Sequence, residues 1–592
     1  MVKFDYIVIL IYFVGLLITG GVLSTKIKNS KDMFIAGRNS SWWIAGLSTY
    51  MTIFSAGSFV VWGGVAFRSG MVAVTIGNAL GIAAIFTGLF ISGRWRKLNI
   101  DSPAEYLGIR FGKATISFYT IVGLIGRSVS TAVALYAVSI MMVALIPLPE
   151  GHILSNPQTG NLSVSYAILI LGIITVIYTI AGGFLAVLMT DVIQFVVLLV
   201  MIIFIIPLAF SSVGGVNSFV ENTPEGFFSL VSGEYSFIWL ILWCILNFFM
   251  ISGDWPFVQR YISVPSVKDA KKTAYLVGAL YLITPLIWYL PALIYRVVDP
   301  GADPEQAYIL MSKHVLPVGM LGIMMAAMLS ATMSMIDSTL NVFAGVFTYD
   351  IYRSLKPGAT EKKLMSVGRI FTLFFGVCII ILALLIPIFG GAERVVVTFL
   401  TLVIMPLFIP SVWGLFSKYI NQKAVWISMG ITYSLGFLIK IGFSNGGILT
   451  KTWEAGKAIA SIVQENVQFL DAFIGLIIPV SILLIIEIIA RRKGISAGWE
   501  RLVRFMEAST NAQQDVFSPA FARFAIKILL WTFAIMGVTI GLMSIFSQAQ
   551  KKVMIIFSIS LLSISAFIIL LYLLSGFIRN KLKKSDKIEI EK

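Results

Sequence analysis

The chain of 592 residues is 58% hydrophobic and only 12% charged, with a mean hydropathy of +0.93. A soluble core does not need so much apolar sequence, so the composition excludes a soluble protein and indicates a polytopic membrane protein. The two cysteines, Cys244 and Cys378, lie in apolar stretches, which excludes a disulfide framework. The formal net charge of +16 could indicate a nucleic-acid partner. The positions of the basic residues along the chain argue against that interpretation.

Fifteen apolar runs follow one another along the chain, and each is long enough to cross the roughly 30 Å hydrocarbon core of a bilayer. We therefore expect an all-α protein with about 15 transmembrane helices. The runs are 4–24, 43–68, 71–95, 115–146, 163–181, 185–211, 236–260, 273–297, 315–351, 366–390, 393–418, 422–443, 468–491, 523–546 and 553–577. The first run has no clear small-residue cleavage site, so we interpret it as a retained helix rather than a signal peptide.

The basic residues lie mainly on one side of the predicted membrane. Connectors after the odd-numbered runs, together with the C-terminal tail, hold 32 of the Lys and Arg residues, and the opposite side holds 10. Because cationic loops stay in the cytoplasm, this bias predicts an N-terminus outside and a C-terminus inside the cell. The charge is thus a topology signal, and we expect no nucleic-acid partner. The expected location is the cell membrane, the inner membrane in a bacterium.

Two of the runs, 43–68 and 236–260, are expected to break at mid-membrane. The residues that favour the breaks are Gly57, Gly63, Gly64, Gly253 and Pro256. Paired interruptions at matching positions of two halves point to a transporter site built from broken helices. The alternative is that Gly and Pro are simply frequent in membrane helices.

These breaks divide the chain into two comparable five-helix units with flanking segments. No connector is long enough for a separate soluble domain. The expected parts are a first helix and cytoplasmic loop (1–42), a first repeat (43–211), an extracellular loop (212–235), a second repeat (236–418), two flanking helices (419–491), a cytoplasmic amphipathic connector (492–522), two C-terminal helices (523–577) and a charged, disordered tail (578–592).

The stretch 323–352 carries a polar stripe in an otherwise apolar run. Its polar members are Ser330, Thr332, Ser334, Asp337, Ser338 and Thr339. A carboxylate at membrane depth costs at least about 2.5–3.5 kcal/mol, so it is rare unless it lines a cavity or an ion path. Positions 331, 334, 335 and 338 share one helical face with Asp337 at its border, and their oxygens suit hard cations. The alternative is that Asp337 pairs structurally with backbone or hydroxyl donors.

Four segments together resemble the sodium/solute symporter family, which includes sodium/glucose, proline and sialic acid cotransporters. They are AGGFLAVLMTDVIQ at 181–194, VQRYISVPSVKDAKK at 258–272, FTYDIY at 347–352 and SPAEYLGIRFG at 102–112. The resemblance runs from about residue 4 to residue 491. It implies a LeuT-like five-plus-five inverted-repeat core, alternating access, and uptake of a small-molecule solute with Na⁺ as the coupling ion and no other cofactor. We expect the monomer to be the functional unit.

The resemblance also implies a principal sodium site, which this chain alters. Carbonyls of Met51, Phe54 and Ala331 match family positions, as does the hydroxyl of Ser334. A second family hydroxyl is replaced by Met335, whose thioether is a poor ligand for a hard cation. We therefore expect this site to be weak.

A second cation site, found in some members such as sialic acid transporters, maps to Asp191, Ser334, Asp337 and Ser338. Residue 337 is a small hydroxyl in those relatives, so this chain gains a carboxylate. Two carboxylates that share a site cannot both ionise cheaply without a cation between them. The arrangement suits Na⁺ held by two anions, or H⁺ on one of them.

The solute pocket that the resemblance implies departs from the sugar carriers. The glutamate that grips sugar hydroxyls falls at Ile76, a lysine at Tyr281 and a glutamine near Val397. The remaining candidate contacts are Ser58 and Phe59 at the first break, Asn247, and an aromatic gate at Phe249 or Met250. A simple hexose would find too few polar partners here.

Arg127 lies deep in the run 115–146 and suggests a different solute. In sialic acid carriers an arginine in this helix binds the substrate carboxylate, and a bidentate contact of that kind justifies the cost of arginine in the membrane. The alternative is a structural arginine bonded to helix-end carbonyls.

The best interpretation of the whole sequence is a cation-coupled symporter, with a proton-coupled or uncoupled carrier or a membrane sensor as alternatives. No motif pairs a nucleophile with a base, so we expect no enzyme.

Overall fold

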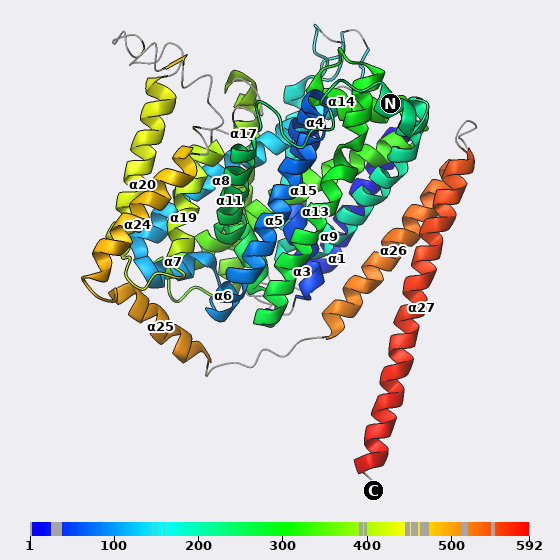
Figure 1. Cartoon of the computed structure of the whole chain (residues 1–592). Helices are drawn as coiled ribbons and strands as arrows, with labels where there is room; N and C mark the ends of the chain where they lie inside the picture. Colours follow the sequence, from blue (N-terminus) through cyan, green and yellow to red (C-terminus); the bar gives the residue numbers. More distant parts are fainter. Residues whose placement is uncertain are drawn as a thin grey trace.

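The computed structural model describes residues 3–24, 38, 40–143, 145–149, 151–158, 160–389, 395, 399–443, 450, 460–461, 470, 473–510, 519–545 and 551–590, with side chains for most of these residues up to 570. These residues form one bundle of helices (Figure 1). Apart from helices, the described part holds two isolated β-bridges, Pro147–Asn161 and Ser155–Leu162, in one loop. The prediction of an all-α membrane protein is confirmed.

The helices and helical turns are α1 (Lys3–Ser24), α3 (Trp42–Ile53), η2 (Ser58–Trp62), α4 (Gly63–Ser69), α5 (Val72–Phe90), α6 (Ser92–Lys97), α7 (Pro103–Phe111), α8 (Lys113–Val143), α9 (Val164–Ser212), α10 (Val216–Glu221), α11 (Phe237–Gly253), α12 (Trp255–Ile262), α13 (Val267–Val298), η3 (Pro304–Gln306), α14 (Ala307–Val315), α15 (Met320–Val346), η4 (Phe347–Tyr352), α16 (Arg353–Leu355), α17 (Glu361–Leu385), η5 (Ile386–Phe389), η6 (Leu400–Ile404), α19 (Met405–Trp413), α20 (Gln422–Phe437), η7 (Leu438–Gly442), η8 (Phe473–Ile477), α24 (Ile478–Arg491), α25 (Ala497–Thr510), α26 (Pro519–Met543) and α27 (Lys551–Ile590).

Within the described residues, 9 helices are long and apolar enough to cross a membrane, or 10 if the bent pair α11–α12 is one span. This is fewer than the fifteen runs of the sequence. Two of those runs, 393–418 and 468–491, lie partly outside the described residues. The short helices α3 and α20 cover parts of two further runs.

Helix α9 differs from the prediction, because its 49 residues cover two expected spans, 163–181 and 185–211, without interruption. A straight helix would place Thr179 and Asp191 about 18 Å apart. Yet Thr179 bonds Asp337 and Asp191 bonds Ser334, and these two partners are one turn apart on α15. The contacts indicate that α9 changes direction between its two apolar stretches while it keeps its helical hydrogen bonds.

Both predicted helix breaks are confirmed. Helix α3 ends at Ile53, Phe54 is extended (φ −83°, ψ 129°), and the helical path resumes at Ser58. The second break separates α11 from α12, which are bent by 55° at the extended residue Asp254. Extended residues at both points leave helix-end peptide groups inside the bundle, where other partners must satisfy them.

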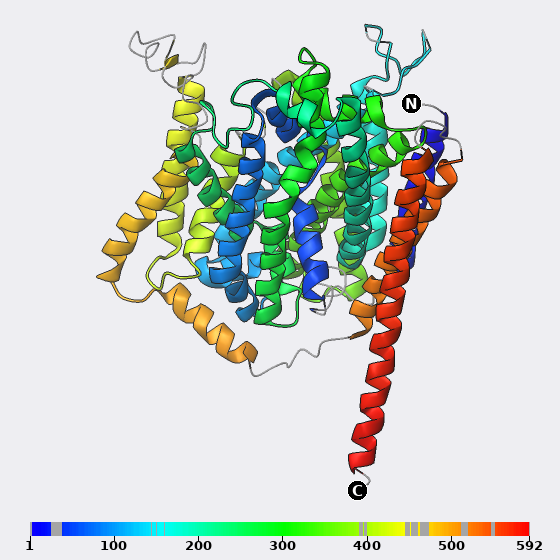
Figure 2. The same cartoon turned by 45° about the vertical axis from the view of Figure 1, so that its right-hand side comes forward.

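The centre of the bundle is α15, all of whose residues are buried. It packs against α1, α8, α9 and α17. Around it, α5 and α13 approach so closely that a Cβ added to Gly278 would lie 3.0 Å from the carbonyl oxygen of Gly81. Figure 2 shows α3, α5 and α13 side by side in front of this core.

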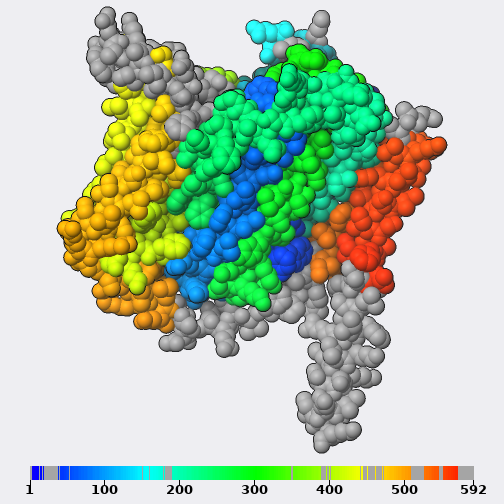
Figure 3. All heavy atoms as spheres, viewed as in Figure 1, coloured from blue at the N-terminus to red at the C-terminus, as the bar shows by residue number. Residues whose placement is uncertain are grey.

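The peripheral helices lie on two opposite flanks (Figures 1 and 2). Helices α20, α24 and α25 form one flank, and α26 and α27 form the other, as the space-filling view also shows (Figure 3). The predicted connector 492–522 contains α25, whose Arg501 donates to the carbonyl of Ile109 at 3.1 Å. The prediction of a disordered tail at 578–592 is wrong for the backbone up to residue 590, because α27 continues to Ile590. Lysine, leucine and glutamate are strong helix formers, so charge alone does not end a helix.

Candidate functional site

The polar stripe of α15 is fully enclosed by neighbouring helices. Ser334, Asp337 and Ser338 are each at most 1% exposed. Since buried polar groups need partners, the question is which helices supply them. For these three residues the partners come from α9 and α12, and α3 adds a hydroxyl that bonds the α9 partner in turn.

Asp191 of α9 is the centre of this cluster. Its Oδ1 accepts a hydrogen bond from Ser334 Oγ at 2.6 Å, and its Oδ2 accepts one from Ser48 of α3. Arg260 of α12 places Nη2 3.7 Å from the same Oδ2, and neither side chain has any exposed surface. The carboxylate is therefore held by two hydroxyls and one guanidinium.

Arg260 also connects the other members of the cluster. Its Nε donates to Ser48 Oγ at 3.1 Å and its Nη2 donates to Ser338 Oγ at 2.6 Å. A third bond, from Nη1 to the carbonyl of Pro256 at 2.9 Å, fixes the side chain to its own helix. A positive charge thus lies between Asp191 and Ser338, where the sequence predicts a coupling cation.

Arg260 has no predicted site role from the sequence alone, where it counts with the cytoplasmic connectors. The signal that could have found it is the motif at 258–272, which carries part of the family resemblance and contains this arginine. Among the described residues, four of the 32 cations used for the orientation are buried, Arg260 together with Arg38, Arg96 and Arg110, which leaves the bias itself large.

Asp337 lies one turn along α15 from Ser334. Its Oδ1 accepts a hydrogen bond from Thr179 in the first stretch of α9. Two residues further on, Thr339 accepts a bond from Thr131 of α8 at 3.2 Å. A hydroxyl partner fits a structural aspartate, and hydroxyl oxygens are also sodium ligands, so the contact is compatible with either role of Asp337.

The candidates for the principal sodium site lie where α3 breaks against α15. The N–H of Ser55 donates to Ser58 Oγ at 3.3 Å, and that of Ala56 donates to Thr332 Oγ1 at 3.1 Å. Because these two N–H groups do not bond back to α3, carbonyls in the last turn of that helix have no helical partner. The carbonyl of Met51 is one of them. Met51, Phe54 and Ala331 are buried, and Met335 on the same face of α15 is 8% exposed.

Two of the solute candidates meet in an aromatic cluster beside this break. The centre of the Phe59 ring lies 4.4 Å from the centre of the Tyr308 ring and 5.2 Å from that of the Phe54 ring. Tyr50 links the cluster to Tyr281, whose ring is 4.5 Å away, and accepts a bond from Trp288 Nε1. The structure therefore joins Phe59 and Tyr281 through Phe54, a candidate of the principal sodium site, and Tyr50, which no sequence pattern had indicated.

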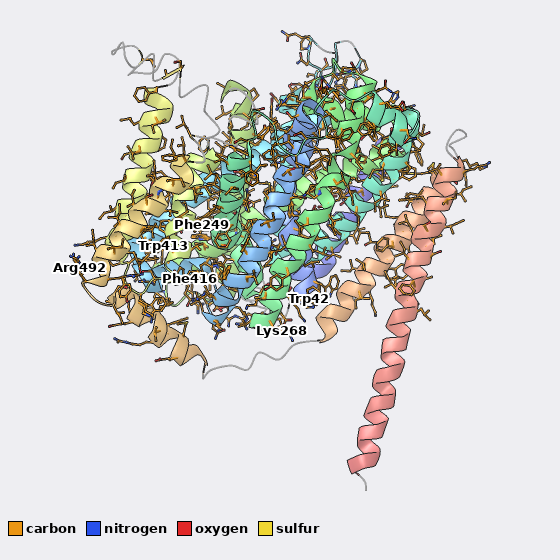
Figure 4. All side chains as sticks on the ribbon, in the orientation of Figure 1. Trp42, Phe249, Lys268, Trp413, Phe416 and Arg492 are labelled. Atoms are coloured by element: carbon orange, nitrogen blue, oxygen red, sulfur yellow. The ribbon has the colours of Figure 1, made fainter. Side chains whose placement is uncertain are left out.

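The other solute candidates have different surroundings. Asn247 is buried and its amide donates to the carbonyl of Trp243 at 2.7 Å, while Ile76 is 1% exposed within the core. Met250 is buried as well, but Phe249 lines a cavity on the flank formed by α11, α19 and α24 (Figure 4). Val397 lies outside the described residues.

Arg127 forms an ion pair at the second helix break. Its Nη2 lies 2.5 Å from Oδ2 of Asp254, and the two side chains are only 10% and 6% exposed. The guanidinium is also 5.8 Å from the centre of the Phe257 ring. The contact ties α8 to the joint between α11 and α12, and any solute carboxylate bound to Arg127 would meet Asp254 there.

Comparisons with known proteins agree with these features. The sequence profile of the sodium:solute symporter family matches residues 33–431. Sodium/myo-inositol cotransporter 2 of Sus scrofa is 26% identical over 486 residues, which covers 73% of this chain and 69% of the relative. Sodium/glucose cotransporter 1 of Mus musculus is 28% identical over 420 residues, covering 62% of this chain and 61% of the relative.

A solved structure shares the fold. It is a Na⁺-coupled sialic acid symporter in a substrate-bound outward-open state, with a TM-score of 0.67 and 22% identity, and the match covers 83% of this chain and 98% of that one. The family match spans well over half of the sequence, and the fold match spans most of the structure. The chain is therefore a multi-pass membrane transporter, not an enzyme, and belongs to the sodium:solute symporter family.

Proposed function

We propose that this protein takes up a small organic solute by alternating access, in symport with Na⁺. The observation that carries the proposal is the buried cluster of Asp191, Ser334 and Ser338, which joins the central helix α15 to α9. Buried carboxylates and hydroxyls of this kind mark ion pathways in membrane proteins. The two broken helices beside it supply the free peptide groups from which transporter sites are built.

The proposed architecture is a LeuT-like five-plus-five inverted repeat with about 15 transmembrane helices. The breaks in α3 and α11–α12, near the start of the segments 43–211 and 236–418, support it. The cation bias supports an N-terminus outside and a C-terminus in the cytoplasm of a cell membrane. The start of α1 and the end of α27 lie at opposite ends of the bundle, as this topology requires (Figure 1). We propose a functional monomer.

We place the coupling cation at Asp191, Ser334, Asp337 and Ser338, and assign Arg260 as its competitor. In the structure the guanidinium occupies one side of Asp191 and bonds Ser338. A cation that enters must share or displace these contacts, so Arg260 lowers the cation affinity of this conformation. The principal site stays weak because Met335 replaces a hydroxyl. Proton coupling is the alternative, since one carboxylate can accept H⁺ instead.

The proposed solute is a sugar, an acidic sugar or another small carboxylate. The names of the relatives, cotransporters of myo-inositol, glucose and sialic acid, support this range. The aromatic cluster around Phe59 and Tyr281 is buried in this conformation, and its rings would stack on a sugar in a conformation that separates them. Arg127 favours an acid, provided that the solute competes with Asp254.

The test is uptake into proteoliposomes. Purified protein is reconstituted, and radiolabelled myo-inositol, glucose and sialic acid are offered with an inward Na⁺ gradient, an inward H⁺ gradient or neither. Accumulation of one solute with the Na⁺ gradient alone supports the proposal. Accumulation driven by H⁺ alone, equilibration without any gradient, or solute binding without uptake would support the proton-coupled carrier, the uncoupled carrier or the sensor instead.

A further inference from the structure

A cavity of about 480 Å³ lies on the flank of the bundle between α5, α11, α19 and α24. Its walls are mostly aromatic or aliphatic. They are formed by Phe90, Phe248, Phe249, Trp413, Phe416 and Leu484. Figure 4 shows Phe249, Trp413 and Phe416 gathered at this flank, toward the end of the bundle where α6 and α25 lie.

The rim of the cavity belongs to the surface that faces lipid. Phe90 is 53% exposed, Phe416 is 42% exposed and Leu484 is 47% exposed, and in a membrane such side chains contact acyl chains. Water fills a cavity only where polar partners are available, and here Ser417, Glu487 and Arg491 supply them on one side only, while the rest of the wall is apolar. The occupant that fits them is a hydrocarbon chain.

Two arginines stand at the same end of the cavity. Arg491 lines it, and the guanidinium of Arg94 lies 4.1 Å from the centre of the Phe416 ring. Both are exposed, and neither forms an ion pair with any carboxylate among the described residues. Arg492 and Lys493 follow directly. An apolar slot bordered by unneutralised cations is complementary to an amphiphile with an anionic head.

One carboxylate, Glu487, also lines the cavity, but it is engaged by the protein. Its Oε2 accepts a hydrogen bond from Ser417 Oγ at 2.5 Å and faces Trp413 Nε1 at 3.3 Å. The side chain is therefore tied to α19, where it fixes the orientation of the Trp413 ring that forms one wall. The guanidinium groups, and not this carboxylate, are available to a headgroup.

We propose that this cavity binds an anionic phospholipid. One acyl chain lies between the rings of Phe249, Trp413 and Phe416, and the phosphate lies at Arg94 and Arg491. Every bilayer lipid has acyl chains, so the chain contacts alone give no preference for one lipid over another. The selectivity must come from the headgroup, where a phosphate without a compensating positive charge meets the arginines.

The test uses Trp413 as its reporter in full-length protein. Vesicles of phosphatidylcholine hold the protein and an equal small fraction of either dibrominated phosphatidylglycerol or dibrominated phosphatidylcholine. The signal is the difference in fluorescence quenching between the unmodified protein and Trp413→Phe. This difference separates the contribution of Trp413 from that of the other tryptophans. The proposal predicts that phosphatidylglycerol occupies the site about fivefold or more in preference to phosphatidylcholine.

Two variants decide whether the arginines carry this preference. In Arg94→Gln/Arg491→Gln, both brominated lipids should quench the fluorescence of Trp413 equally. Arg94→Lys/Arg491→Lys keeps the charge and should retain the preference for phosphatidylglycerol. Arg504→Gln, an exposed arginine of α25, is the matched control and should behave as the unmodified protein. Equal quenching by both lipids in the unmodified protein would overturn the proposal. So would a preference that survives in the double glutamine variant.

Discussion

Arg260 and Asp191 face each other across 3.7 Å in the interior of the helix bundle, and neither has any exposed surface. Removing two charges from water costs several kcal/mol per ion, which only close geometry and additional hydrogen bonds can offset. Ser48 accepts from Arg260 and donates to Asp191, and Ser338 and Ser334 complete the shell. The pair is thus part of one network that includes two hydroxyls of the candidate cation site.

Arg260→Gln should lower the free energy of unfolding by about 3–5 kcal/mol, because it leaves Asp191 buried without its cation. The measurement is thermal unfolding of purified protein without Na⁺. Asp191→Asn/Arg260→Gln should recover a large part of the loss. Arg504→Gln, which breaks a pair whose side chains are 76% and 53% exposed, should change stability by less than about 1 kcal/mol. A double variant as unstable as the sum of its single variants would show that the pair is not coupled.

The same variant tests the competition between Arg260 and the coupling cation. Without the guanidinium, Na⁺ meets an uncompensated carboxylate, so Na⁺ should raise the unfolding temperature of Arg260→Gln more than that of the unmodified protein. Choline at equal ionic strength is the control for screening. An identical Na⁺ effect in both proteins would contradict the idea that Arg260 and Na⁺ share Asp191.

The Arg127–Asp254 pair separates the two interpretations of Arg127. If Arg127 binds a solute carboxylate, Arg127→Ala should abolish binding of an acidic solute, while Asp254→Asn should tighten it by removing the competing carboxylate. Solute-dependent thermal shifts measure both effects. Normal transport by Arg127→Ala or Arg127→Lys would show that the arginine is structural.

Topology can be tested by cysteine labelling. In a Cys244→Ser/Cys378→Ser background, Gln158→Cys and Ser232→Cys should react with an impermeant maleimide added to intact cells, and Thr360→Cys should not. Gln158 and Thr360 are exposed at the surface of the protein, and Ser232 is partly exposed. Labelling of residue 360 in intact cells, or labelling of residues 158 and 232 only after permeabilisation, would contradict the proposed orientation.

Local sequence features predicted much of the fold. Apolar length gave the helices, and glycine or proline near Ser55 and Asp254 gave both breaks. The continuity of α9 was not predicted, because the small residues between its two apolar stretches suggested two separate helices but do not end the helix. The helical tail was not predicted, because its high charge suggests disorder although its residues are good helix formers.

The candidate site was predictable only in part. Asp191, Ser334 and Ser338 were named from the resemblance, and the structure brings them together around one carboxylate. Arg260 was missed because 69 residues separate it from Asp191 and no local pattern records their contact. Thr179 as the partner of Asp337 was missed for the same reason: pairing between helices is set by packing, which periodicity along one helix does not reveal.

The most direct test of the account is the Na⁺ dependence of solute uptake in Asp337→Asn, with Met335→Ser as the matched variant on the same helix face. Asp337→Asn preserves the shape of the side chain and removes its charge, so uptake should lose its dependence on Na⁺. Met335→Ser restores a hydroxyl at the principal site and should retain Na⁺ dependence. Uptake that keeps its full Na⁺ dependence in Asp337→Asn would contradict the account, and would place the cation at the principal site despite Met335.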